Sequence, residues 1–113
     1  MKMNNQVQLI GRVGRDPELK TLDSGRKLVR LSMATNDFYK DASGNRVEET
    51  QWHNLVGWGG LAETIEKHVS KGQELAVSGK LVHRSYDDND GVTRYVTEVV
   101  LNDFVFIGGS KAA

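Results

Sequence analysis

The chain has 113 residues, the size of one domain, and contains no cysteine, which excludes a disulfide framework, a thiolate metal site and a cysteine nucleophile. No apolar run approaches the ~18 residues of a membrane span, and residues 1–5 lack the apolar core of a signal peptide, so we expect a cytoplasmic protein without membrane contact. The 15 basic and 15 acidic side chains cancel, which argues mildly against nucleic-acid binding, because phosphate binders usually carry a basic surplus.

The pattern of the first half of the chain predicts three strands separated by turns. Residues 6–13 and 28–36 alternate apolar and polar side chains, the period of a half-buried strand. Pro17 cannot sit in a central strand and marks the connection between them as a loop. The Asp-Ala-Ser-Gly-Asn segment at 41–45 is typical of a hairpin turn, so the chain returns along a third strand, residues 47–58.

The pattern of the second half predicts one helix and two more strands. Apolar residues four apart from Leu61 to Val69 form one stripe of a helix. Two further strands follow at 74–83 and 94–107. Five strands with a helix between the third and the fourth predict an all-β OB-fold, a small Greek-key barrel, with residues 1–113 as a single domain.

Two tryptophans mark the third strand as a candidate binding surface. Trp52 and Trp58 are six residues apart, so strand alternation places both on one face, with Asn54 between them and Leu55 pointing the other way. Flat rings on an open face can stack on nucleic-acid bases. The alternative is that both rings belong to the core, because tryptophan is usually largely buried.

Several separated motifs carry a family resemblance. They are Asn5 and the segments 7–18, 31–36, 50–53, 71–72 and 95–99. In this order, over about Asn5 to Gly109, the chain closely resembles the DNA-binding domain of bacterial single-stranded DNA-binding proteins. The resemblance implies a homotetramer of OB-folds that wraps single-stranded DNA without sequence preference in replication, recombination and repair.

The resemblance also assigns aromatic residues that stack on bases. The family's stacking positions fall on Tyr39, Trp52, Trp58 and Tyr86. Phe38 stands beside Tyr39, and because adjacent strand residues face opposite ways, only one of the two can line the groove. For Tyr39 and Tyr86, the alternative is a loop aromatic that folds back onto the barrel.

Cations for the phosphates are fewer than in relatives, because Asn54, Gly60 and Ser85 stand where these often have Lys or Arg. The remaining candidates are Arg12, Arg15, Lys20, Lys40, Lys71 and Arg84. Taken alone, each is more often a solvated surface charge than a phosphate contact. Residues 1–46 carry nine basic and five acidic side chains, and residues 47–113 carry six and ten, which is compatible with a basic groove opposite an acidic face.

The resemblance places a subunit interface along the first strand, at Val7 and Leu9, with His53 as its neighbour. The three histidines lack ligand spacing, so we expect no metal site. The family's main members continue into a tail with an acidic tip that recruits repair enzymes, and residues 108–113 lack this tip. If this end is native, recruitment through a tail is not expected; if it was trimmed, nothing follows.

The candidate enzyme signatures in the sequence lack essential residues, and we expect neither catalysis nor a cofactor. The Asp-rich segment at 87–91 lacks both anchoring acids of a calcium loop, and a solvated hairpin turn explains it better. The glycines at 11–14 and 57–60 lack the Lys and Ser/Thr of a P-loop. Two alternatives remain: a dimeric primosomal protein of the same fold that binds single-stranded DNA weakly, and an OB-fold used only for protein contacts.

Overall fold

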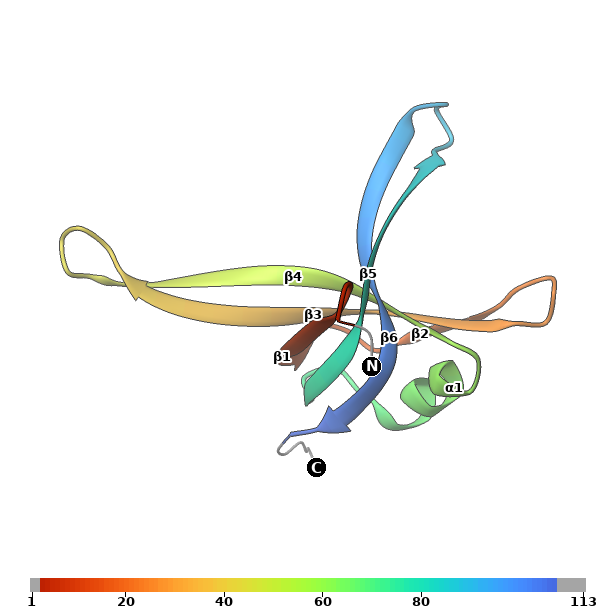
Figure 1. Ribbon diagram of the computed structural model, residues 1–113, viewed down its shortest axis with the longest axis horizontal. Coiled ribbons are helices and arrows are strands. Elements are labelled where there is room, and N and C mark those ends of the chain that lie inside the picture. The colour runs from red at the N-terminus through yellow and green to blue at the C-terminus, as the bar shows by residue number, and fades with distance from the viewer. Residues whose placement is uncertain (1–2, 108–113) are drawn as a thin grey trace.

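The computed structural model describes residues 3–107, and Figure 1 shows a small barrel from which two long hairpins project. Its elements are β1 (Val7–Val13), β2 (Glu18–Thr21), β3 (Lys27–Lys40), β4 (Arg46–Trp58), α1 (Gly59–His68), β5 (Glu74–Asp87) and β6 (Thr93–Phe106). The expectation about a C-terminal tail concerns residues 108–113, which lie outside the described residues.

Five strands close the barrel in the order β1-β5-β6-β4-β3, and β3 pairs back with β1. Neighbouring strands are antiparallel except β4 and β6, which are parallel. The closing β3–β1 contact is short, since β1 pairs with β3 only at Arg12 and Val13. This ring of five strands, with α1 between β4 and β5, confirms the all-β OB-fold predicted from the sequence.

The core lies inside this ring and follows the predicted alternation. Val29, Leu31 and Met33 of β3 point inward and are buried, whereas Arg30 between them is exposed. On β4, Leu55 faces the same core. The period-two pattern of residues 28–36 therefore identified the inward face of this strand correctly.

The helix packs against β3, β4 and β2 at one side of the barrel (Figure 1). It begins at Gly59, two residues before the predicted start, because Gly59 takes a φ of 64° that turns the chain directly out of β4. Ala62, Ile65 and the following Val69 are buried in the core cluster. The predicted apolar stripe is thus the face that packs against β3 and β4.

The segment after Pro17 is a strand, where the sequence predicted only a loop. Residues Glu18–Thr21 form β2, which pairs with the start of β3, and Leu19 packs against the core opposite Val29. A four-residue strand with one apolar side chain has too little alternation to be recognised from sequence. β2 lies outside the ring of five and extends the sheet as an additional strand next to β3.

Two hairpins extend beyond the barrel as arms, and one strand of each is clearly longer than predicted: β3 continues to Lys40 and β5 to Asp87. The β3–β4 ladder runs without interruption from Leu28 opposite Trp58 to Lys40 opposite Arg46. The β5–β6 ladder has a register shift at Ser78/Gly79 and continues to Asp87 opposite Thr93. Backbone pairing persists there although neither face meets the core, so the apolar periodicity ends before the strand does.

Both arms end in the same kind of turn, as the sequence predicted. Asp41 accepts hydrogen bonds from the backbone N–H groups of residues 43 and 45, and Asp88 does the same for residues 90 and 92. The fourth residue of each turn is a glycine, Gly44 or Gly91, with a φ of 85° or 79°. The Asp-rich segment is therefore a hairpin turn in which Asp88 also pairs with Arg94 at 2.9 Å.

Candidate nucleic-acid interface

One outer face of the β3–β4 sheet carries both predicted tryptophans. In the strand register, Trp52 lies opposite Ala34, Asn54 opposite Ser32 and Trp58 opposite Leu28. Alternation places all of these side chains on the face opposite to the core residue Leu55. Trp52 and Trp58 therefore share a face, as their spacing predicted.

Trp52 is an open ring and not part of the core. Its side chain is 63% exposed. The underside of the ring rests on the chain just after β1, where a Cβ on Gly14 would lie 2.5 Å from ring carbon Cζ3. Because glycine has no side chain, the ring can lie directly against the backbone at residue 14, and the rest of the ring is available for stacking.

Trp58 has different surroundings at the end of β4. It is half-buried, and the guanidinium of Arg26 lies 4.3 Å from the centroid of its ring. This is a cation–π distance, so the arginine already covers part of the ring. The core alternative is wrong for Trp52, and Trp58 is half-buried without belonging to the core cluster.

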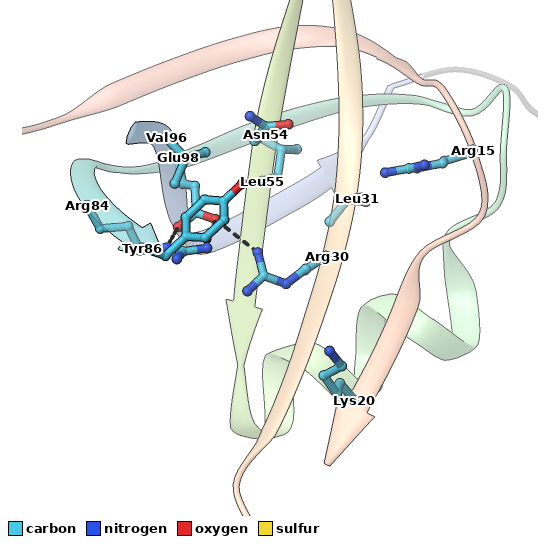
Figure 2. Close-up of a pocket in the computed structure, with 10 residues that line it drawn as sticks. All are labelled: Arg15, Lys20, Arg30, Leu31, Asn54, Leu55, Arg84, Tyr86, Val96 and Glu98. Carbon is cyan, nitrogen blue, oxygen red and sulfur yellow. Dashed lines mark hydrogen bonds and ion pairs between the residues drawn. The ribbon is translucent and has the colours of Figure 1, made fainter. Parts of the chain in front are cut away.

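A groove of about 510 Å³ is lined in part by Asn54, which lies between the two tryptophans on their strand face, although neither ring lines it; Figure 2 shows the lining residues. Five elements or loops contribute polar groups. They are Arg15 and Lys20 from the β1–β2 region, Arg30 from β3, Asn54 from β4, Arg84 and Tyr86 from β5, and Glu98 from β6. The structure therefore brings four predicted residues, Arg15, Lys20, Arg84 and Tyr86, to one groove.

Arg30 and Glu98 belong to the groove and were missed by the sequence prediction. Glu98 accepts two hydrogen bonds from Arg84 and one from Arg30, each 3.0 Å long. Hydrogen bonding from Arg84 lowers the pKa of the Glu98 carboxyl below its usual value, and the same bond raises the pKa of Arg84. The lowered pKa keeps the Glu98 carboxyl ionised at neutral pH.

Three predicted phosphate contacts do not line this groove. Arg12 donates a hydrogen bond to the carbonyl of Gly72 and lies 3.9 Å from Glu74. Lys71 lies next to Gly72 in the loop between α1 and β5, and its backbone N–H donates a hydrogen bond to the Asp16 carboxylate. Lys40 stands at the far end of β3, on the arm. Contacts of these cations with DNA stay predictions, and they would lie outside the groove.

The register settles which of the neighbours Phe38 and Tyr39 shares the tryptophan face. Counting along β3 from Ala34, which is opposite Trp52, alternation puts Phe38 on that face and Tyr39 on the other. The guanidinium of Arg46 lies 4.1 Å from the centroid of the Phe38 ring. The family's position was assigned to Tyr39, but its ring does not lie on the face of Trp52.

The residues predicted for a subunit interface mostly face inward. Val7 and Leu9 are partly buried and pack against the core. His53 is half-buried, and its Nε2 is 2.9 Å from the hydroxyl of Thr35. What β1 can offer to a second copy is its backbone edge, because within residues 3–107 it pairs with β3 only at its last two positions.

The described residues contain neither a cluster of metal ligands nor a helix that could span a membrane. Between residues 3 and 107, no three His, Cys, Asp or Glu side chains are grouped so that they could hold a metal ion. The one helix in that range, α1, is too short and too polar to cross a membrane.

Comparison with known proteins identifies the family. Residues 4–107 match the model of the single-strand binding protein family. Single-stranded DNA-binding protein 1 of Chlorobaculum tepidum is 42% identical over 109 residues, which cover 96% of this chain and 67% of that protein. The Rickettsia felis single-stranded DNA-binding protein is 45% identical over 102 residues, covering 88% of this chain and 67% of that protein.

Solved structures give the same result. A Plasmodium falciparum SSB in complex with single-stranded DNA has a TM-score of 0.85 at 32% identity, covering 96% of this chain and 98% of the other. A deletion mutant of the Thermus aquaticus single-stranded DNA binding protein has a TM-score of 0.81 at 28% identity, covering 93% and 51%. This chain belongs to the single-strand binding protein family.

Proposed function

We propose that this protein binds and protects single-stranded DNA without sequence preference, in replication, recombination and repair. The observation that carries the proposal is an exposed Trp52 on the same sheet face as a groove lined by arginines. A relative with the same fold was solved with single-stranded DNA bound. Binding without catalysis fits a family of DNA-binding proteins, and the site of action would be the cytoplasm, on nucleoid DNA.

The surface suits single strands better than duplexes. Unpaired bases expose their faces and can stack on Trp52 and Tyr86, whereas the bases of a duplex are already stacked on each other. Stacking is tolerant of sequence, because every base has an aromatic face. The basic groove beside the rings would take the phosphates of the same strand.

The rings contribute more to the proposed affinity than any one cation. Base stacking is worth ~1 to 3 kcal/mol per base, and a protein with few phosphate contacts gains little from counterion release. The carboxylate of Glu98 reduces the net charge of the groove further. We assign stacking to Trp52, Trp58 and Tyr86 and add Phe38, while Tyr39 stays a prediction on the other face.

We also propose that the protein is a homotetramer built on two surfaces of the barrel. The first is the free backbone edge of β1, which a second copy can extend as a continuous sheet. The second is the outer face of the β1-β5-β6 sheet. There Ile10 and Val105 flank Ala76 in register and are exposed. A dimer would use only one of these surfaces.

Titration of tryptophan fluorescence with oligo-dT tests the binding function. Stacking on Trp52 should quench the emission strongly and saturate with added oligonucleotide. A duplex of equal length is the control and should quench weakly, while oligo-dA and oligo-dC should behave as oligo-dT does. Absence of quenching and of comigration in a gel shift would contradict the proposal and favour an OB-fold that contacts proteins only.

A further inference from the structure

The groove contains one acidic side chain among its basic ones. Glu98 is only 5% exposed, although it stands in the wall of a surface groove. Its Oε1 accepts from Arg84 Nε, and its Oε2 accepts from both Arg84 Nη2 and Arg30 Nη1. Arg84 is therefore held at two points, in the geometry that makes arginine–carboxylate pairs specific.

Both arginines keep donors for a further anion. Their side chains are 44% and 38% exposed, for Arg30 and Arg84 respectively. A guanidinium has five N–H groups, and Glu98 takes only one from Arg30 and two from Arg84. In Figure 2, the two guanidiniums approach Glu98 from opposite sides, with the Tyr86 ring beside them.

We propose, on the basis of the DNA-binding function above, that Glu98 is a built-in counter-anion of the groove. It positions Arg30 and Arg84 so that together they bind one DNA phosphate. It also limits the net charge of the two arginines and the glutamate to that of one cation. Two guanidinium charges and one carboxylate charge leave a single positive charge, which one phosphodiester neutralises. Arg30 is thereby a phosphate-contacting residue, and Glu98 is a positioning residue that sets the salt dependence of binding.

Glu98 has two opposite effects on a bound strand, and the charge effect is the larger. By ordering the arginines it favours binding, but the backbones of both residues are also held by the sheet. They arise from paired strands, and Arg84 lies 5.8 Å from the centroid of the Tyr86 ring. A neutral glutamine would still accept a hydrogen bond from one of them. The negative charge, in contrast, directly opposes the phosphate that the arginines bind.

The variant Glu98→Gln tests the proposal through the salt dependence of oligo-dT binding. Without the carboxylate, the pair carries a second positive charge that can neutralise one more phosphate, so we expect the slope of log K against log salt to steepen by about 0.7 for each groove that the oligonucleotide occupies. At 0.1 to 0.2 M salt this corresponds to roughly three- to five-fold tighter binding. Glu66→Gln makes the same charge change on α1, which does not line the groove, and should leave the slope unchanged. An unchanged or flatter slope for Glu98→Gln would overturn the proposal.

A charge-balanced pair of variants keeps the test valid if Glu98→Gln alone does not fold. Arg30→Gln should flatten the slope by about 0.7, and adding Glu98→Gln to it should restore the slope of the parent. If the double variant keeps the slope of Arg30→Gln, Glu98 does not act as a counter-anion. If the parent binds oligo-dT but the variants show none of these changes in slope, the proposed role of Glu98 is wrong and the proposed DNA-binding function stands. If the parent does not bind oligo-dT, the proposed function fails as well.

Discussion

The two tryptophans illustrate how residues of the same type on the same strand face acquire different roles from their neighbours. Trp52 rests on a glycine and leaves most of its ring open, whereas Trp58 is half-buried and partly covered by Arg26. An open ring stacks without rearrangement. A covered ring must first exchange its cation contact for a base.

Replacement of Trp52 should therefore separate binding from stability. We expect Trp52→Ala to weaken oligo-dT binding by ~1 to 3 kcal/mol while the thermal midpoint stays within a few degrees of the parent. Trp58→Ala should weaken binding and also lower the midpoint, because a half-buried ring and its Arg26 contact are lost together. Binding titrations and melting curves on the two variants check this. Equal binding by Trp52→Ala and the parent would contradict stacking on that ring.

Phe38 and Tyr39 form a matched pair for a second test, since each is 53% exposed on the same arm. Only Phe38 shares the face of Trp52, so Phe38→Ala should weaken oligo-dT binding by ~1 to 3 kcal/mol, and Tyr39→Ala should have a smaller effect. Neither ring supports the core, and both variants should melt like the parent. A larger loss for Tyr39→Ala would mean that the strand follows the opposite face of the arm.

The sequence identified site residues that can be recognised from their own residue type or family position. It missed residues whose role depends on a contact with a distant side chain. The tryptophans, Arg84 and Tyr86 stand out by type and by family resemblance. Arg30 alternates with core residues exactly as a solvated side chain would, and its hydrogen-bond partner Glu98 is 68 positions away. No local pattern encodes a contact over that distance, so the cluster required the sheet register.

The elements show where apolar periodicity is and is not informative. The core-facing parts of β3 and β4 and the helix were predicted because burial imposes a period on their side chains. The far ends of β3 and β5 were not predicted, since these strands continue into the arms through backbone pairing with both faces exposed. β2 was missed because it contributes one apolar residue, Leu19, to the core.

Barrel closure depends on a close approach of two elements, β1 and β3. A Cβ at Gly11 would collide with the backbone carbonyl of Ala34, so the strands can approach only if residue 11 is glycine. We expect Gly11→Ala to lower the free energy of unfolding by ~1 to 3 kcal/mol, measured by urea denaturation.

Gly60→Ala is the matched control for this substitution. Apart from its chain neighbours and the helix's own backbone, no atom lies within 4 Å of a Cβ built at Gly60, which is in the first turn of α1. Alanine also favours a helix more than glycine does, so the free energy of unfolding should stay the same or rise slightly. If Gly11→Ala is as stable as this control, the barrel closes by a route that leaves room for a side chain.

The whole molecule is more extended than a compact domain of its length. Its radius of gyration is 16.1 Å, against about 13 Å expected for a compact chain of this size. The excess comes from the two arms, which have exposed faces and no core of their own (Figure 1). Such arms gain their packing from a partner, and the candidates are a DNA strand and a second copy of the chain.

The oligomeric state tests the two proposed contact surfaces separately. We expect sedimentation at micromolar concentration to give a tetramer. Val105→Lys places a charge on the exposed apolar row of the β1-β5-β6 sheet, where its burial without a partner is unfavourable, and should reduce the tetramer to a dimer joined at the β1 edges. Val92→Lys adds the same charge at the tip of an arm and should leave the tetramer intact. A monomeric parent would exclude both surfaces. A dimeric parent that Val105→Lys does not change would leave the β1 edge as the single interface and would favour the dimeric primosomal alternative.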